Sequence, residues 1–130
     1  KKIKLVNKNI IIRSKFSNNK ESILKRLTYH DFTYLYKLIK NKKYKNLKII
    51  ENNFGILHFS IKFDNKLFIF KYNLNSKIKK HKFNNRNLIT TENILKKMLT
   101  KIINDDVDYT LNKKISIFSN RITNLINEKI

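Results

Sequence analysis

Few side chains in this sequence could carry acid–base or metal chemistry. The chain has no Cys, which excludes thiolate metal sites, Cys nucleophiles and disulfides together. Its three histidines are His30, His58 and His81. His30 precedes Asp31, but neighbours in sequence do not face each other on a helix, so the pair predicts a helix-surface histidine in preference to a catalytic dyad. His81 stands among lysines, which favours a hydrogen-bond donor in a basic patch over a metal ligand.

Three acidic residues form the other candidate: Asp105, Asp106 and Asp108. Carboxylates so close together could bind Mg²⁺ in a small nuclease. Acids at the start of a helix, where backbone N–H groups and the helix dipole favour negative charge, are the preferred interpretation. A single Gly in 130 residues cannot build a phosphate-binding loop. We therefore expect no enzyme, no cofactor, no metal and no small-molecule substrate.

Charge is the dominant feature of the composition. Thirty Lys and Arg residues oppose nine Asp and Glu residues, giving a net charge of +21. The charge falls along the chain: 15 basic and two acidic residues in 1–50, eight and two in 51–90, seven and five in 91–130. Abundant Lys, Ile and Asn indicate an AT-rich gene, so part of the Lys excess can come from coding bias. The alternative to a binding surface is therefore a Lys-rich face that is simply exposed to solvent. The scarcity of acids does not come from coding bias, and it favours a polyanionic partner.

Two basic segments, 37–48 and 71–86, carry most of the predicted contacts to RNA. Their candidate residues are Lys37, Lys40, Lys42, Lys43, Lys45, Lys48, Lys71, Lys77, Lys79, Lys80, His81, Lys82 and Arg86. Lys binds phosphate as a flexible point charge, and nearby aromatics such as Tyr36 and Tyr44 can stack on unpaired bases. The scarcity of Arg predicts recognition by shape and backbone. A basic helix on a membrane surface is the weaker alternative, and no apolar run is long enough to cross a membrane.

The pattern of apolar residues predicts an α+β domain with a mixed sheet. Strands are expected at 9–16 and 46–51, and a β-hairpin at about 55–73 with its turn at Asp64-Asn65. A helical pattern covers 20–41, although residues 28–31 could divide it, with Asp31 capping a second helix. The segment 75–86 is expected to be a basic loop.

Two helices are expected after the sheet, one starting near Thr90 and a long amphipathic one at the C-terminus. The last helix has an apolar stripe that fits a partner helix or the chain's own core: Leu111, Ile115, Phe118, Ile122 and Leu125. The expected organisation is a basic RNA-binding body (1–108) followed by a possible protein-docking helix (109–130).

Residues 27–53, LTYHDFTYLYKLIKNKKYKNLKIIENN, and 88–99, LITTENILKKML, resemble the ribosomal large-subunit stalk-base protein family in its organellar form. In that family a basic α/β body sits on large-subunit rRNA, and a C-terminal helix recruits acidic stalk proteins. The fall in charge along this chain suits that division.

Together these features predict a non-catalytic ribosomal protein. Its expected partners are rRNA and neighbouring ribosomal proteins, without a membrane. Its expected location is a mitochondrial or other organellar ribosome, or otherwise the cytoplasm of an AT-rich endosymbiont. The alternative is a non-ribosomal structural or assembly subunit of an organellar complex, held to its partners by the terminal helix.

Overall fold

The computed structural model describes residues 5–40, 42–88 and 109–129 of the chain. Its elements in chain order are β1 (Lys8–Ser14), α1 (Lys20–Tyr36), β2 (Tyr44–Asn53), β3 (Ile56–Phe63), β4 (Lys66–Asn73), β5 (Lys80–Phe83), β6 (Arg86–Asn87) and α3 (Tyr109–Lys129). The predicted α+β class is confirmed. The helix expected from Thr90 lies outside the described residues, as do Asp105, Asp106 and Asp108.

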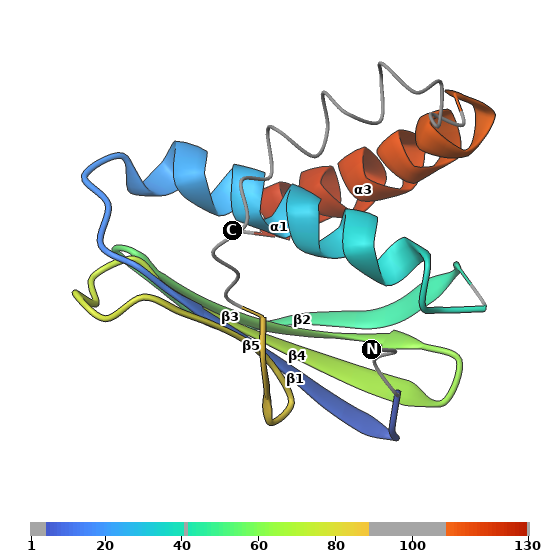
Figure 1. The fold of residues 1–130 in the computed structure, drawn as a ribbon. Coiled ribbons are helices and arrows are strands. Elements are labelled where there is room, and N and C mark those ends of the chain that lie inside the picture. The colour runs from blue at the N-terminus through green and yellow to red at the C-terminus, as the bar shows by residue number, and fades with distance from the viewer. Residues whose placement is uncertain (1–4, 41, 89–108, 130) are drawn as a thin grey trace, which may run out of the picture.

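The six strands form one mixed sheet in the order β2-β3-β4-β1-β5-β6 (Figure 1). From β1 the chain passes through α1 to β2 at the sheet edge and returns strand by strand until β4 lies parallel to β1. β5 then pairs antiparallel on the other side of β1. The run Ile10-Ile11-Ile12 suits this central place, because a strand with neighbours on both sides buries much of its surface.

The hairpin of β3 and β4 is confirmed, with its predicted turn. Asp64 adopts a left-handed conformation (φ 54°), which Asp tolerates better than most residues. On one side of this hairpin the aromatic side chains form the sheet's core face, and Phe59 stacks on Phe70 with ring centroids 4.7 Å apart. Such pairs add about 0.5–1.5 kcal/mol beyond area burial.

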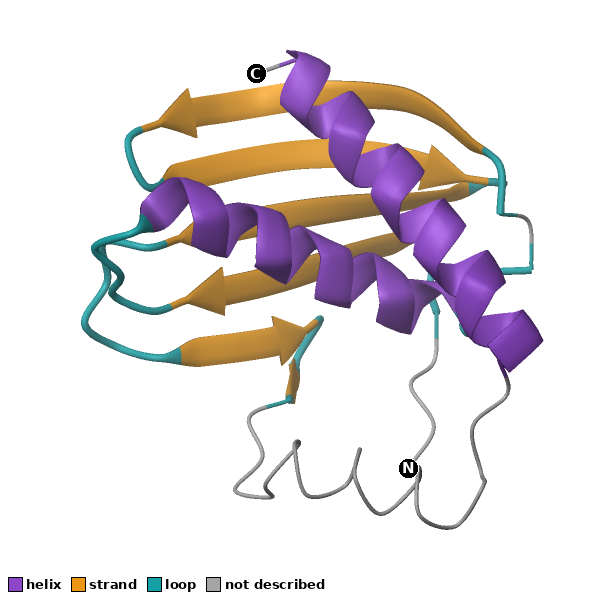
Figure 2. Cartoon of the chain, turned by 90° about the horizontal axis from the view of Figure 1, so that it is seen from above, coloured by secondary structure: helices purple, strands orange, loops and turns teal. Residues whose placement is uncertain are grey.

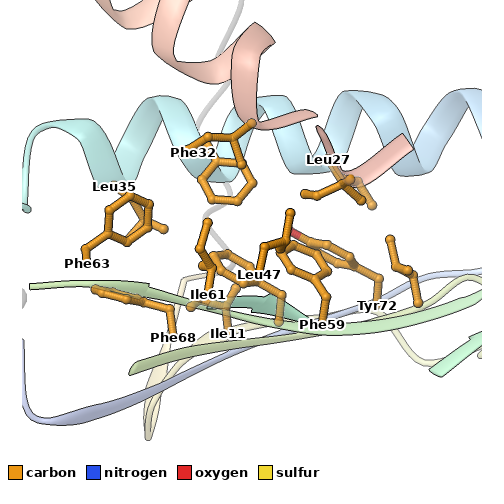
Figure 3. Packing of buried hydrophobic residues seen from close by; sticks show 14 of the residues in the cluster. Ile11, Leu27, Phe32, Leu35, Leu47, Phe59, Ile61, Phe63, Phe68 and Tyr72 are labelled. Atoms are coloured by element: carbon orange, nitrogen blue, oxygen red, sulfur yellow. The ribbon is translucent and has the colours of Figure 1, made fainter. Parts of the chain in front are cut away.

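Both described helices cover this core face, as Figure 2 shows from above. α1 is one continuous helix, so the division at residues 28–31 that the sequence left open does not occur. Asp31 caps no helix; its side chain points with those of Phe32 and Leu35 toward the sheet, where all three are buried. In Figure 3, Leu27, Phe32 and Leu35 lie between α1 and the aromatic side chains of the strands.

α3 packs on α1 through its apolar stripe. Ile115, Phe118 and Ile122 are buried and Leu125 is partly buried, whereas Leu111 is 38% exposed. The ring of Phe118 contacts those of Phe32, Tyr36 and Phe63. Most of the stripe therefore packs on the chain's own core, which is one of the two possibilities that the sequence left open.

Polar contacts between the two helices accompany this packing. The Tyr29 hydroxyl lies 3.0 Å from that of Ser116, and the Thr33 hydroxyl lies 3.1 Å from that of Ser119. Thr33 already donates its proton to the carbonyl of Tyr29, so Ser119 must be the donor in the second contact. The small serines let the helices approach closely without leaving these hydroxyls unpaired.

The segment 75–86 is not a loop throughout, which corrects the prediction. Lys80–Phe83 form β5 beside β1, and the turn at Asn84-Asn85 leads into β6. Asn84 holds this turn through a left-handed conformation (φ 54°) and a side-chain oxygen that accepts a 2.7 Å hydrogen bond from the Ile10 N–H. Phe83 anchors the strand by burying its ring in the core.

Candidate nucleic-acid interface

The side of the sheet opposite the two helices presents a second, very different surface. Side chains alternate along a strand, and residues paired across strands point to the same side. The register therefore defines an open face that consists of Lys8, Ile10, Ile12, Ser14, Lys45, Lys48, Glu51, Asn53, Ile56, His58, Ser60, Lys62, Leu67, Ile69, Lys71, Asn73, Lys80, Lys82 and Asn87. Figure 1 shows α1 and α3 together on the other side of the sheet.

Seven lysines stand on the open face, contributed by every strand from β1 to β5: Lys8, Lys45, Lys48, Lys62, Lys71, Lys80 and Lys82. Among the residues of this face the only carboxylate is that of Glu51, and its Oε1 lies 3.3 Å from Nδ1 of His58. Lys45 and Lys62 start about 4.8 Å apart as cross-strand partners, and Lys80 and Lys82 start about 6.7 Å apart on the same side of β5, so both pairs fall within a Debye length of about 8 Å at physiological salt. The two lysines of each pair therefore repel one another.

Lys45 and Lys62 show this repulsion most directly. The two residues are cross-strand partners on β2 and β3, side by side on the open face. Like charges directly opposite each other destabilise a sheet, so this pair opposes folding in the isolated protein. A polyanion lying across the face would remove that penalty.

Three of the basic residues predicted in 71–86 lie on the open face: Lys71, Lys80 and Lys82. Lys77 and Lys79 are exposed in the connection from β4 to β5. Arg86 pairs with Phe83 and so shares the helix side of the sheet. His81 also turns to that side, with Nε2 3.5 Å from Oδ1 of Asp31, away from the lysines that flank it in sequence.

The basic residues of 37–48 likewise lie partly on the open face and partly elsewhere. Lys45 and Lys48 belong to the open face, while Lys37 follows the end of α1 and Lys40 and Lys43 are exposed between α1 and β2. Lys42 donates to the carbonyl of Tyr36 and lies 4.5 Å from the centre of the Tyr36 ring. Burial lowers the pKa of Lys42.

Tyr44 in this segment and Tyr36 just before it do not support the stacking role predicted from the sequence. Tyr36 packs against Phe118 with ring centroids 5.2 Å apart, and Tyr44 is partly buried against the core. Both side chains are therefore engaged in packing within the domain.

Asp31 is the centre of a buried ionic cluster on the helix side of the sheet. Arg13 contacts both carboxylate oxygens, the Tyr72 hydroxyl donates a 2.7 Å hydrogen bond, and His81 lies 3.5 Å away. Burial acts to raise the pKa of Asp31, but the contacts with His81, Arg13 and Tyr72 outweigh it and hold the pKa below its ordinary value. Burial and the nearby carboxylate raise the pKa of Tyr72 well above its usual range.

This cluster has the character of a structural ion pair. The contacts that the structure shows for Asp31 come from three strands and do not include His30, whose own pKa is lowered first by burial and then by Arg13. The carboxylate ties α1 to the sheet and gives His81 a partner other than RNA. Among the described residues, no three His, Asp or Glu side chains gather in a way that could hold a metal ion.

Two open-face lysines, Lys8 and Lys62, are absent from the set predicted from the sequence. The place of Lys62 on the open face could have been predicted, because Lys62 alternates with Ile61 and Phe63 along the strand and must point away from them. The place of Lys8 could not, because its position beside Leu67 depends on the parallel pairing of β1 with β4.

No protein-family model matches the chain, and comparisons with curated proteins and with solved structures likewise give no match. None of the helices that the structure describes is sufficiently long and apolar to span a membrane.

Proposed function

We propose that this chain binds structured RNA without catalysing a reaction, and that the open face lies on the RNA. The observation that carries the proposal is the placement of seven lysines on one side of a sheet, with Lys45 and Lys62 directly opposite each other. The lysine-bearing part of the face extends over about 19 Å across β2-β3-β4-β1-β5 and about 20 Å along β1. At the charge density of a B-form duplex, 20 Å of helix carries roughly a dozen phosphates, ample for all seven side chains.

The proposed setting is a ribosome, in a mitochondrion or another AT-rich compartment, with the protein as a structural constituent. The net charge of +21 and the resemblance of residues 27–53 and 88–99 to the stalk-base family support this setting. The exposed lysines of 37–43 and 77–79 extend the basic surface beyond the open face. Neighbouring ribosomal proteins are the proposed protein partners.

Binding of a stem–loop RNA over a range of salt concentrations tests the proposal. If the seven open-face lysines each neutralise one phosphate, the plot of log K against log salt should have a slope of about −6, and affinity should fall by about 10³- to 10⁴-fold between 50 and 200 mM. A flat salt response, or no binding at 50 mM salt, would contradict it.

Two double variants locate the surface. Lys45→Gln with Lys62→Gln removes two charges from the open face, and Lys113→Gln with Lys114→Gln removes two exposed charges from α3. The first pair should reduce the salt slope by about 2, because each lost phosphate contact removes about 1. The second pair should leave the slope nearly unchanged. Equal losses from both pairs would show that binding is not localised on the open face.

Sedimentation tests the setting. A ribosomal protein should travel with large particles and leave them after RNase treatment. Travel with RNase-resistant particles would instead favour the structural subunit of a protein complex.

A further inference from the structure

The middle of the open face is apolar. Ile10 and Ile69 are direct partners on β1 and β4, Ile12 follows Ile10 along β1, and Leu67 precedes Ile69 along β4. These four residues, which we term the aliphatic centre, are each partly exposed. They lie on two adjacent central strands and form one continuous surface.

Lysines stand on both sides of each end of the aliphatic centre. Ile12 lies between Lys71 on β4 and Lys82 on β5, each its direct partner in the sheet. Leu67 lies between Lys62 on β3 and Lys8 on β1. Each lysine starts about 4.8 Å from the aliphatic side chain beside it, so its ammonium group can reach a ligand resting on that side chain.

The exterior of an RNA duplex is a poor chemical match for the aliphatic centre. A duplex offers phosphates, sugars and hydroxyls, and polar groups placed on a dry aliphatic surface lose hydration without gaining partners. An unpaired nucleotide offers an apolar base face next to a phosphate. That combination matches an aliphatic side chain with a lysine on each side.

We propose that the aliphatic centre receives unpaired bases, with Lys8, Lys62, Lys71 and Lys82 on the phosphates beside them. This inference rests on the proposed RNA-binding function and narrows it: the substrate is a single-stranded or unstacked stretch of RNA. Ile and Leu are able to stack against or insert between bases, as apolar wedges do in other nucleic-acid complexes.

An acidic amphipathic helix of a protein fits the same surface less well. A helix with its side chains is about 10–12 Å wide. The aliphatic centre is two residues wide at Ile10 and Ile69 but only one residue wide at each end, where lysines stand about 4.8 Å to either side. A helix lying there would cover the lysines as well as the apolar residues, whereas a flat base covers only the latter.

The test compares a 12-nucleotide unpaired RNA with a duplex of equal length, using the full chain. The variant Ile12→Thr with Ile69→Thr keeps the β-branched shape and removes apolar surface from the centre. Ile56→Thr is the matched control, since Ile56 is on the same face but pairs with Asn73, outside the centre. Thermal melts confirm that each variant is folded.

Wild type should bind the unpaired RNA more tightly than the duplex. The double variant should lose five- to tenfold in affinity for the unpaired RNA, with an unchanged salt slope and little change for the duplex, and Ile56→Thr should behave as wild type. Photocrosslinking of 4-thiouridine RNA to the wild-type chain should mark β1 and β4, a readout that does not depend on any variant folding.

Three results would overturn the inference. The first is equal or tighter binding of the duplex together with crosslinks away from β1 and β4; RNA binding itself would then still stand. The second is tighter binding of an acidic amphipathic peptide that displaces the RNA. The third is protection of Lys8, Lys62, Lys71 and Lys82 from acetylation in the protein alone, which would show that another part of the chain or a second copy covers the face. Absence of binding to either RNA at low salt would reject the proposed function as well.

Discussion

The guanidinium of Arg13 spans the carboxylate of Asp31, with Nε 3.0 Å from both oxygens and Nη2 2.7 Å from Oδ1. Arg13 comes from β1 and Asp31 from the middle of α1, so this contact fixes the helix against the central strand. Tyr72 of β4 adds its hydroxyl to the same carboxylate. The ionised carboxylate thus joins three elements that are distant in sequence.

Replacing Asp31 with Asn should destabilise the fold by about 3–5 kcal/mol, because Arg13 would remain largely buried without a counter-charge. Urea unfolding measures the change. Asp64→Asn is the control: the same substitution at an exposed turn residue should change stability by less than about 1 kcal/mol. Similar losses at both positions would show that the ion pair contributes little.

The stabilising effect of Asp31 should disappear at low pH. Its pKa in the folded protein is below that of an unfolded aspartate, about 3.9, so the ionised carboxylate stabilises the fold above that value. The contribution is lost as the pH falls through the folded-state pKa. The stability difference between wild type and Asp31→Asn should therefore be present at neutral pH and shrink as the pH falls below about 4 toward the folded-state pKa. A difference that does not shrink on acidification below pH 4 would mean that ionisation is not its source.

Phe118→Ala should cost about 3–5 kcal/mol, because the ring fills space between Phe32, Tyr36 and Phe63. Ile117→Ala, one residue away and half exposed, should change stability by no more than about 0.5 kcal/mol. Denaturant midpoints measure both. If Phe118→Ala is as stable as wild type, the packing of α3 on α1 contributes little, and a role as a docking helix for another protein would be favoured.

Asn84 stabilises the turn between β5 and β6 in two ways that mutations can separate. Asn84→Gly keeps the left-handed turn but loses the hydrogen bond to the Ile10 N–H, whereas Asn84→Ala loses both. We expect melting temperatures in the order wild type, Gly, Ala, and faster hydrogen exchange at Ile10 in both variants. Asn85→Ala, at the exposed neighbour, is the control. Equal melting temperatures for the Gly and Ala variants would show that backbone conformation is unimportant here.

The elements that sequence predicted well are those with local signals. The β3–β4 hairpin follows from Phe and Leu alternating with polar residues around Asp64-Asn65, and α3 follows from apolar residues spaced by four and three. The alternation also places Lys62 and Lys71 opposite the aromatic side chains, which is enough to predict a basic side on this hairpin.

The parts that escaped prediction depend on contacts between distant segments. KHKF has no strand signal of its own; it becomes β5 because β1 offers an edge and Phe83 reaches the core. Asp31 resembled a cap because nothing nearby in sequence reveals Arg13 and Tyr72 as partners. The open face as a whole requires the strand order, since its lysines come from five strands.

The central place of β1 has a consequence for how the protein is made on the ribosome. The first strand leaves the exit tunnel long before β4 and β5, the two strands between which it must lie. Until they follow, the isoleucines of β1 have no strand beside them, and only the β2–β3 hairpin can form by pairing neighbours in sequence. Nascent chains halted before β4 should therefore need a chaperone over residues 8–14, and those released after β5 should not.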